Sequence, residues 1–452
     1  MLQNKFIIQS LYLAVLICLC LTVPCLSRAD SIRYIRDTEI ENTIRIYTKP
    51  ILRVAGITDD TLKTHIINDP AINAYVANGQ KIFLTTGLLR QSKNAQQIIG
   101  VIAHEIGHIA GGHLIRLHKK IKKAKTTAFI SQIMGLALSA VVKNPAGAIA
   151  VTSGGEHLAE RSFLNFSRGQ EQAADQAAAK YLDKIGVSGK GLLELLNVLA
   201  GQEFLQSYNQ DPYVRSHPLT QSRIRFMENH VRNSSQSNNN LPAHIVEKQL
   251  RMIAKLDAFL DTPEETLKKY SERDQTIPAR YARAIAMFRQ ADLARALPAI
   301  NSLIAEYPSD PYFIELKAQM LFENGRLNDA MIVYQQAVRL LPRAPLIRTS
   351  LAHVMTEIGQ AGLYDRALFH TKQALKFDPA FALTWRLAST LYGRKKKFGL
   401  AAWSLAEYNI LLGRNRLALA QAKRALKLLK VGSPAWLRTE DLKNDIDYQS
   451  RN

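Results

Sequence analysis

The sequence contains very little cysteine. Its three cysteines, Cys18, Cys20 and Cys25, all lie before Leu26 in a chain of 452 residues. The rest of the chain therefore forms no disulfide and offers no thiolate as a nucleophile or metal ligand. Any metal site beyond Cys25 must be built from His, Asp and Glu side chains.

Acidic residues are also scarce. The chain has 38 Asp and Glu against 59 Lys and Arg, which gives a formal net charge of +21. Such a balance suits nucleic acid, an anionic membrane surface or acidic partners. No nucleic-acid-binding motif accompanies it, so we expect no nucleic acid among the partners. A basic surface facing anionic lipid is the more economical interpretation, beside the simpler one of a solvated surface.

Apolar runs that approach membrane-spanning length are confined to the N-terminus. Lys5 precedes the run FIIQSLYLAVLICLCLTV, and Ser27-Arg28-Ala29 resembles a small-x-small cleavage site. We expect a signal peptide over residues 1–29, cleaved near Ala29, and hence an exported protein. A retained membrane anchor is the alternative. Lipid attachment at Cys25 is disfavoured, because Pro24 stands where a small residue is needed.

A second apolar run is shorter. The basic stretch HKKIKKAK is followed by an apolar-rich run from Ala128 to Val142. This run is short for a bilayer span. A buried helix is the first interpretation of residues 118–142, and a helix lying on a membrane surface is the second.

The remaining patterns divide the chain into two domains. Residues 31–54 and about 156–200 have apolar residues at helical spacing, whereas 71–89 alternates like a strand or hairpin with Asn78-Gly79 as its turn. These patterns predict a mainly helical domain with a small β-sheet over residues 30–232. The polar, aperiodic stretch 233–242 ends in Pro242 and is expected to be a linker.

Residues 243–452 repeat a pattern of small residues and proline. Gly325-x4-Ala330-x6-Ala337-x4-Pro342 recurs from Gly362 to Pro379, with a degraded earlier copy from Ala291 to Pro308 and a copy without proline from Gly413 to Ala425. The step from Pro308 to Pro342 equals the period of the tetratricopeptide repeat, about 34 residues. Trp385, Leu387, Leu391 and Tyr392 fit the first helix of such a repeat. We expect an all-helical superhelix, with insertions at the two later and longer steps between copies.

The stretch VIAHEIGHIAGGH carries candidate metal ligands. His104 and His108 lie four residues apart, so on a helix both imidazoles lie on one face and can bind one ion. Glu105 is placed to take a proton from water on that ion. The apolar flanks favour this interpretation, because a buried imidazole needs a polar partner. The alternative is an amphipathic helix whose histidines only border a core.

A third ligand is expected from a second helix. Within FSRGQEQAADQAAAKYL, Glu171 and Asp175 are four residues apart and share one face. Glu171 can complete a site of two histidines and one glutamate with a fourth position open to water, as catalytic zinc requires. Asp175 can accept a hydrogen bond from a ligand histidine. His113 comes one residue too early to be a third histidine ligand, since one residue turns the side chain by about 100°. It is either a polar group contacting a ligand or a surface histidine.

With these residues in place, the sequence resembles the periplasmic, tetratricopeptide-bearing branch of the HtpX/CAAX-protease-like zinc metallopeptidases. The resemblance rests on the pentads 104–108 and 171–175, on Ser216-His217-Pro218-Leu219 and on the order of leader, protease domain, linker and repeats. It implies a gluzincin-like fold, periplasmic localisation and one Zn²⁺ per chain held by His104, His108 and Glu171.

The resemblance also implies roles for further residues. His217 would lie near the metal and occupy its open position at rest, and Arg223 would orient the site or stabilise developing negative charge. The partners implied are unfolded or misassembled envelope proteins and the outer-membrane β-barrel assembly machinery. The function predicted is metal-assisted peptide hydrolysis with Glu105 as general base and Asp175 and Arg223 in support.

Three further interpretations stay open. The strand predicted around Tyr75 to Thr85 can accept an extended substrate at its edge. A non-catalytic repeat scaffold or assembly chaperone with structural zinc is the alternative to a hydrolase. An integral membrane protease with the same site is the third.

Overall fold

The computed structural model describes residues 33–58, 62–77, 80–113, 116, 154–201, 213 and 216–449. The predicted signal peptide, the Asn78-Gly79 turn and the segment 118–142 lie outside these residues. Within the described part, no helix combines the length and the apolar character that crossing a bilayer demands.

The N-terminal domain contains a four-stranded sheet in the order β1-β2-β4-β3. The strands are β1 (Tyr34–Ile35), β2 (Lys63–Ile67), β3 (Ala74–Ala77) and β4 (Lys81–Thr85). β2 and β4 are parallel, and the outer strands pair with them in antiparallel fashion. The edge predicted for Tyr75 to Thr85 therefore needs correction: β3 forms an edge, whereas β4 lies inside the sheet.

The alternating pattern also extends further than the strand. It predicted strand or hairpin up to Leu89, but the chain becomes helical in α3 (Thr86–Gln91). The side chain of Thr85 accepts a hydrogen bond from the backbone N–H of Leu88, which caps the helix. Gly87 packs so closely that an added Cβ would lie 2.2 Å from the carbonyl oxygen of Pro70. The cap at Thr85 and the close packing of Gly87 thus favour a helix, although apolar and polar residues alternate in this stretch.

Helix α4 lies at the centre of the N-terminal domain. It contacts α2, α7, α8 and β3, and from Gln97 to Gly107 every residue is buried. A helix that is apolar on all sides is stable only when it is covered on all sides. The helices of this domain are α2 (Thr38–Ala55), α3, α4 (Ala95–Ala110), α7 (Gly154–Lys184), α8 (Lys190–Ala200) and α10 (Gln221–Asn233).

The chain between α10 and α11 (Ala243–Leu260) contains no helix or strand. It is fixed to the N-terminal domain, for example where the Ser188 hydroxyl donates to the Ser237 carbonyl over 2.9 Å. Met252 and Leu256 of α11 belong to the same apolar core as α4. The core of the N-terminal domain therefore extends beyond the predicted linker.

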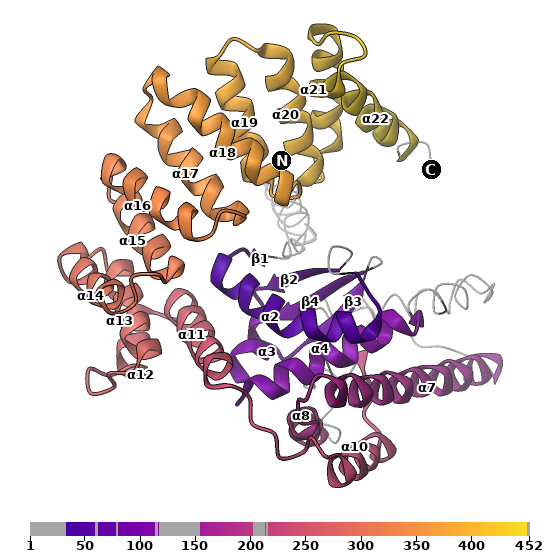
Figure 1. The fold of residues 1–452 in the computed structure, drawn as a ribbon. Coiled ribbons are helices and arrows are strands. Elements are labelled where there is room, and N and C mark those ends of the chain that lie inside the picture. Colours follow the sequence, from indigo (N-terminus) through magenta and orange to yellow (C-terminus); the bar gives the residue numbers. More distant parts are fainter. Residues whose placement is uncertain are drawn as a thin grey trace, which may run out of the picture.

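The rest of the chain is helical, and in Figure 1 its helices follow one another along an arc that starts with α11 beside α3. The remaining elements are α12 (Pro263–Lys269), α13 (Ile277–Arg289), α14 (Leu293–Glu306), α15 (Pro311–Glu323), α16 (Leu327–Leu340), α17 (Pro345–Ile358), η3 (Ala361–Leu363), α18 (Tyr364–Phe377), α19 (Ala382–Arg394), α20 (Phe398–Leu411), α21 (Asn415–Leu428) and α22 (Pro434–Gln449). The predicted fold class, mainly α with a small sheet and then all α, is confirmed.

The alanines of the repeats are the contact points between helices. Ala330 and Ala337 on α16 are fully buried, as are Ala367 and Ala374 on α18. Small side chains at these positions let paired helices approach closely, as the sequence pattern predicted. The insertion in the step from Pro342 to Pro379 corresponds to the 3₁₀ turn η3.

The longer step from Gly362 to Gly413 needs a different explanation. It contains a complete helix pair, α19 and α20, so it is not an insertion into one repeat. The turn of this pair has Lys396 with φ 57°, where the pair α15–α16 has Gly325 with φ 75°. A lysine in the left-handed conformation hid the repeat from the glycine pattern. The next alanines of the pattern lie on α21, the helix after this pair.

Buried charges connect the two domains at the N-terminus of α2. Glu39 is 3% exposed and forms an ion pair of 2.6 Å with Arg251. Lys255 lies 2.7 Å from Asp37, the N-cap residue of α2. The hydroxyl of Thr38 donates to Glu315 of α15 over 2.9 Å. At least one partner of each contact is buried, which makes these contacts specific for one arrangement of the domains.

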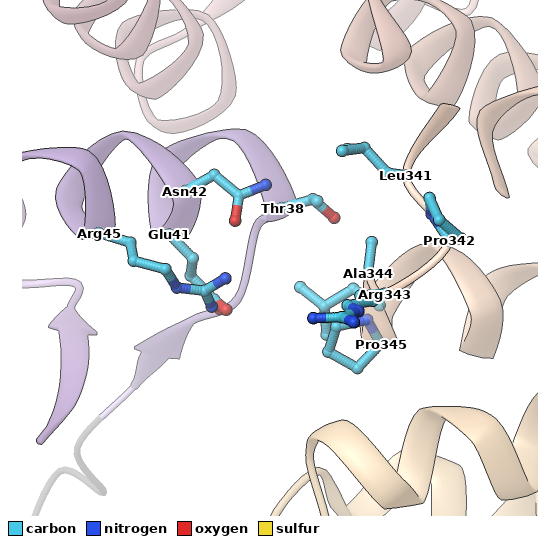
Figure 2. Close-up of a pocket in the computed structure, with 10 residues that line it drawn as sticks. Thr38, Glu41, Asn42, Arg45, Leu341, Pro342, Arg343, Ala344 and Pro345 are labelled. Carbon is cyan, nitrogen blue, oxygen red and sulfur yellow. The ribbon is translucent and has the colours of Figure 1, made fainter. Parts of the chain in front are cut away.

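A cavity of about 280 Å³ lies beside this interface, between α2 and the loop that joins α16 to α17. Figure 2 shows Arg45 on one wall and Arg343 on the other. None of the residues that line it is among the predicted site residues, so the chemistry suggested by the sequence must be sought elsewhere.

Candidate metal centre

The two motif histidines lie together on α4. Asn94 caps this helix by accepting a hydrogen bond from the backbone N–H of Gln97. The four-residue spacing brings the Nε2 atoms of His104 and His108 within 3.0 Å of each other. His104 is fully buried. Two imidazole nitrogens therefore face one point inside the protein.

Helix α7 brings two carboxylates to the same point. The Oε2 atom of Glu171 lies 3.3 Å from His104 Nε2, and its Oε1 atom lies 3.3 Å from His108 Nε2. One turn further along α7, Asp175 Oδ1 lies 2.9 Å from the other ring nitrogen of His104. Glu171 thus faces the inner nitrogens, whereas Asp175 lies behind His104.

A glycine makes this approach of the helices possible. A Cβ added to Gly107 would lie 2.9 Å from the carbonyl oxygen of Ala174 and 3.2 Å from the Cβ of Ala177. The helix backbones are therefore in direct contact between the histidines and the carboxylates. The alanine-rich sequence of α7 allows the same contact from the other side.

His217 approaches from the loop before α10. Its Nδ1 atom lies 3.1 Å from Glu171 Oε2 and 3.4 Å from His104 Nε2. Its Nε2 atom lies 3.2 Å from the carbonyl oxygen of Ala74 in β3. A proton on Nε2 suits the contact with this carbonyl, and that tautomer would leave the lone pair of Nδ1 free for a metal ion. His217 therefore links the cluster to the edge strand.

The distances in this cluster match the donor geometry of a zinc ion. Ligand atoms of His104, His108, Glu171 and His217 all lie within 4.8 Å of one another. Bonds of about 2.0–2.1 Å in a tetrahedron place neighbouring donors about 3.3 Å apart. The separations of 3.0 to 3.4 Å agree with this value. Nitrogen and carboxylate donors without thiolate also suit zinc, so the residues fit the ion.

The electrostatics keep the carboxylates ionised. Burial would raise the pKa of Glu171, but the charge and contacts of His217, His104 and His108 lower it well below its usual value. Burial would likewise lower the pKa of His104, yet its contacts with Asp175 and Glu171 raise it to about 9. The carboxylate of Glu171 is thus ionised, and a bound cation could take the place of the protons that the imidazoles hold.

Arg223 supports this arrangement from the first turn of α10. Its Nε atom donates to Asp175 Oδ2 over 2.6 Å, and its Nη1 atom lies 3.0 Å from Glu171 Oε2. Nη1 also donates to the carbonyl of Pro218 over 3.0 Å. The side chain is 1% exposed. One buried guanidinium therefore holds both carboxylates and the loop of His217.

Glu105 differs from its neighbours. It is fully buried, and both of its carboxylate oxygens lack a hydrogen bond within the described part of the chain. His217 Nε2 lies 3.4 Å from Oε1, without hydrogen-bonding geometry. An unsatisfied buried carboxylate is costly and requires an explanation. A group that exchanges protons with water or substrate provides one.

The sequence left His113 between two interpretations and missed Tyr213. The structure favours the polar group that contacts a candidate ligand, because His113 is buried and its Nδ1 atom lies 2.9 Å from His108 Nδ1. Tyr213 is fully buried and stacks on His217 with ring centroids 4.6 Å apart. The signal for Tyr213 was its position four residues before His217, which places it one helical turn away.

Comparison with known proteins identifies the class of this domain. Residues 38–231 match the model of peptidase family M48. These residues form an M48 metallopeptidase domain, and the chain is a metalloendopeptidase. The resemblance seen in the sequence is thereby confirmed.

The relatives extend over most of the chain. It is 24% identical over 380 residues to the β-barrel assembly-enhancing protease of Yersinia pestis, covering 82% of this chain and 75% of that one. The protein of the same name in Escherichia coli K12 is 22% identical over 381 residues, with coverage of 81% and 75%. The mitochondrial metalloendopeptidase OMA1 of Schizosaccharomyces pombe is 28% identical over 185 residues, 40% of this chain and 50% of that one.

Two solved structures show a distant likeness to the chain. The structure called MamA MSR-1 C2 has a TM-score of 0.31 at 16% identity and covers 37% of this chain and 94% of that one. The yeast Tom70 structure has a TM-score of 0.31 at 13% identity, with coverage of 81% and 82%.

Proposed function

We propose that this chain is a zinc-dependent endopeptidase of the cell envelope that cleaves misfolded or stalled exported proteins, including those of the outer membrane. The assignment of the envelope is supported by the exported character of the N-terminus and by the name of the relatives. The observation that carries the chemistry is the cluster of His104, His108 and Glu171 next to the unsatisfied carboxylate of Glu105.

His104, His108 and Glu171 would hold the zinc ion. When bound, zinc acidifies water and polarises the scissile carbonyl. Asp175 fixes the orientation of His104 through the outer ring nitrogen, 2.9 Å away. Arg223 fixes Asp175 in turn through its two donated hydrogen bonds.

Glu105 would act as the general base. Its carboxylate receives a proton from the attacking water and delivers it to the leaving amine. Among the residues that the structure describes, none donates a hydrogen bond to either oxygen, which leaves both available for this transfer.

Replacing Glu105 by Gln tests the assignment. The amide keeps the shape of the side chain but accepts no proton, so zinc content should stay near one per chain while cleavage of an unfolded protein such as casein falls by about 10²–10⁴-fold. Zinc is measured by mass spectrometry and cleavage by release of labelled peptide. Unchanged cleavage would refute the role of Glu105.

His217 would keep the enzyme latent. With Nδ1 at the fourth corner of the cluster, no corner is left for water. His217→Ala should therefore raise casein cleavage, whereas His244→Ala, at an exposed position on α11, should leave it unchanged. Reduced cleavage in His217→Ala would make this histidine part of the chemistry instead.

The edge strand β3 would bind the substrate backbone. Because the Ala74 carbonyl faces His217 and not β4, the alternation of the antiparallel ladder places the N–H and C=O of Val76 on the same free edge. An extended peptide can add to β3 there. In the resting arrangement, His217 contacts the Ala74 carbonyl, which is the first hydrogen-bond acceptor along this edge.

Two substitutions of Val76 distinguish the contribution of its backbone to substrate binding from that of its side chain. Val76→Pro removes the N–H and should abolish cleavage by a His217→Ala enzyme. Val76→Ala keeps the N–H and should retain most of the activity. Equal activity of the two variants would exclude strand addition.

A second function, as an assembly chaperone, is favoured by the name of the relatives, which refers to enhanced assembly as well as to proteolysis. The helical repeats would hold the client, and the partners would include the outer-membrane β-barrel assembly machinery. Complementation of a null strain by Glu105→Gln tests this role. Full rescue by the inactive enzyme would show that holding, not cutting, is the essential activity.

A further inference from the structure

The last third of the repeat domain contains a long stretch without acidic residues. Between Glu407 and Glu440 there is no Asp or Glu, yet the stretch contains seven basic residues. They are Arg414, Arg416, Lys423, Arg424, Lys427, Lys430 and Arg438. Most of this stretch forms helix α21 and the turns on either side of it. The net charge of the chain is therefore locally concentrated.

Helix α21 buries its small residues and exposes its large ones. Ala418, Ala422 and Ala425 are fully buried, and Ala418 and Ala422 pack in a cluster with residues of α20 and α22. Leu417 is 54% exposed and Leu428 is 53% exposed. A soluble helix normally turns its leucines toward the core. In α21 the alanines contact the core, and the two leucines are exposed and can contact an external partner.

The exposed residues form two adjacent rows. Arg416, Lys423 and Lys427 are separated by steps of seven and then four positions, so they follow one line along the helix. Leu417, Arg424 and Leu428 have the same spacing one position later and form the neighbouring line. We call these six residues the α21 face. All six are exposed.

The cations of this face have no partners of their own. Within the described part of the chain, none of its four Lys and Arg side chains forms an ion pair or a hydrogen bond. Arg438 behaves differently, because its Nε atom lies 2.8 Å from Glu407. The charge of the α21 face is thus available to an external anion.

We propose that the α21 face lies on an anionic lipid surface. The rows extend over about 17 Å of helix, which matches several lipid headgroups better than one acidic side chain. Leucines beside lysines and arginines are the combination that interfacial helices use, because the apolar side chains enter the acyl boundary while the cations contact headgroups. The repeat domain would then hold the protease close to a membrane without spanning it.

Vesicle binding tests this proposal with the full mature chain. Wild-type protein should sediment with vesicles that contain phosphatidylglycerol and not with pure phosphatidylcholine. Charge reversal in the triple variant R416E/K423E/K427E should weaken binding to the anionic vesicles by about a hundredfold or more. The variant L417S/L428S should also weaken binding, because it removes the apolar contact and keeps the charge.

A control variant separates this face from the general charge of the protein. Lys268, Arg273 and Arg339 are exposed basic residues elsewhere in the repeat domain, and K268E/R273E/R339E changes the net charge equally. It should bind anionic vesicles within about twofold of wild type. Circular dichroism verifies that all variants are folded. Equal loss in both triple variants, or wild-type binding to an acidic protein but not to vesicles, would overturn the proposal.

Discussion

At the scale of single residues, the site depends on side chains that do not face the metal position. Asp175 contacts the outer nitrogen of His104, and Arg223 contacts Asp175, Glu171 and the loop of His217. Each of these side chains is buried and makes several contacts. The orientation of the candidate ligands is thus set by a small number of charge-assisted hydrogen bonds.

Replacing Asp175 by Asn tests this support. The amide cannot hold both the His104 ring and the Arg223 guanidinium as the carboxylate does, so zinc affinity should fall by about 10–100-fold. Competition with a chelator measures the affinity. Asp183→Asn makes the same change two turns later on α7, where the carboxylate accepts from Ser234 and lies 3.3 Å from His230, and it should leave the affinity unchanged.

Much of the site was accessible from the sequence because its spacing is local. The four-residue steps from His104 to His108 and from Glu171 to Asp175 define helix faces without knowledge of the fold. Tyr213 left only the weak signal of its four-residue spacing from His217, and the Ala74 carbonyl left no signal. The contact of a backbone carbonyl with His217 has no signature in side-chain identity.

At the scale of elements, the contact between α4 and α7 determines whether the ligands converge. Gly107 allows the backbones to touch, and the carboxylates on α7 reach the histidines only at that distance. A shift of α7 by the size of a methyl group would separate Glu171 from both imidazoles.

The substitution Gly107→Ala should therefore weaken zinc binding although it favours the helix. Its Cβ would lie 2.9 Å from the Ala174 carbonyl, which forces the helices apart. Gly169→Ala on α7 is the matched control, because a Cβ there meets nothing within 4 Å. The control should keep zinc and gain up to about 1 kcal/mol in unfolding free energy. Zinc titration and urea unfolding of both variants decide the outcome.

Helices were predicted well from the sequence where the spacing of small residues agrees with the packing between helices. The repeat helices from α13 to α18 follow the alanine spacing, because small residues at helix contacts leave a periodic trace. Of the pair α19–α20, the first helix was predicted from the residues between Trp385 and Tyr392. The second helix was missed, since Lys396 adopts the left-handed conformation that the pattern assigned to glycine. The alternation before Leu89 failed for another reason: the cap at Thr85 starts a helix there.

At the scale of the whole molecule, buried charges hold the repeats against the protease domain. Glu315 faces the start of α2, with Thr38, Lys255, Asp37 and Glu39 as its charged and polar neighbours. Burial raises the pKa of Glu315 to about 8, opposed by Lys255 and reinforced by Asp37. No sequence pattern indicated this interface, because charged residues at a helix start are usually solvated.

This raised pKa predicts a pH-dependent stability. A carboxyl group with a folded-state pKa near 8 binds its proton more tightly in the folded chain, so its contribution is complete below about pH 4.5 and is lost as the pH rises through 8. Glu315→Gln carries no proton to lose. Melting temperatures should thus fall less for the variant than for wild type between pH 5 and 8.5. Parallel curves would contradict the prediction.

The two contacts of His217 have a consequence for which proteins are attacked. Under the proposed mechanism, a peptide N–H of the substrate replaces His217 at the Ala74 carbonyl. A peptide N–H that makes no other hydrogen bond does this most readily. Natively folded proteins keep their amides occupied in helices and sheets, whereas unravelled chains present them in series. The enzyme would then distinguish unfolded from folded proteins by their free backbone N–H groups and not by their side chains.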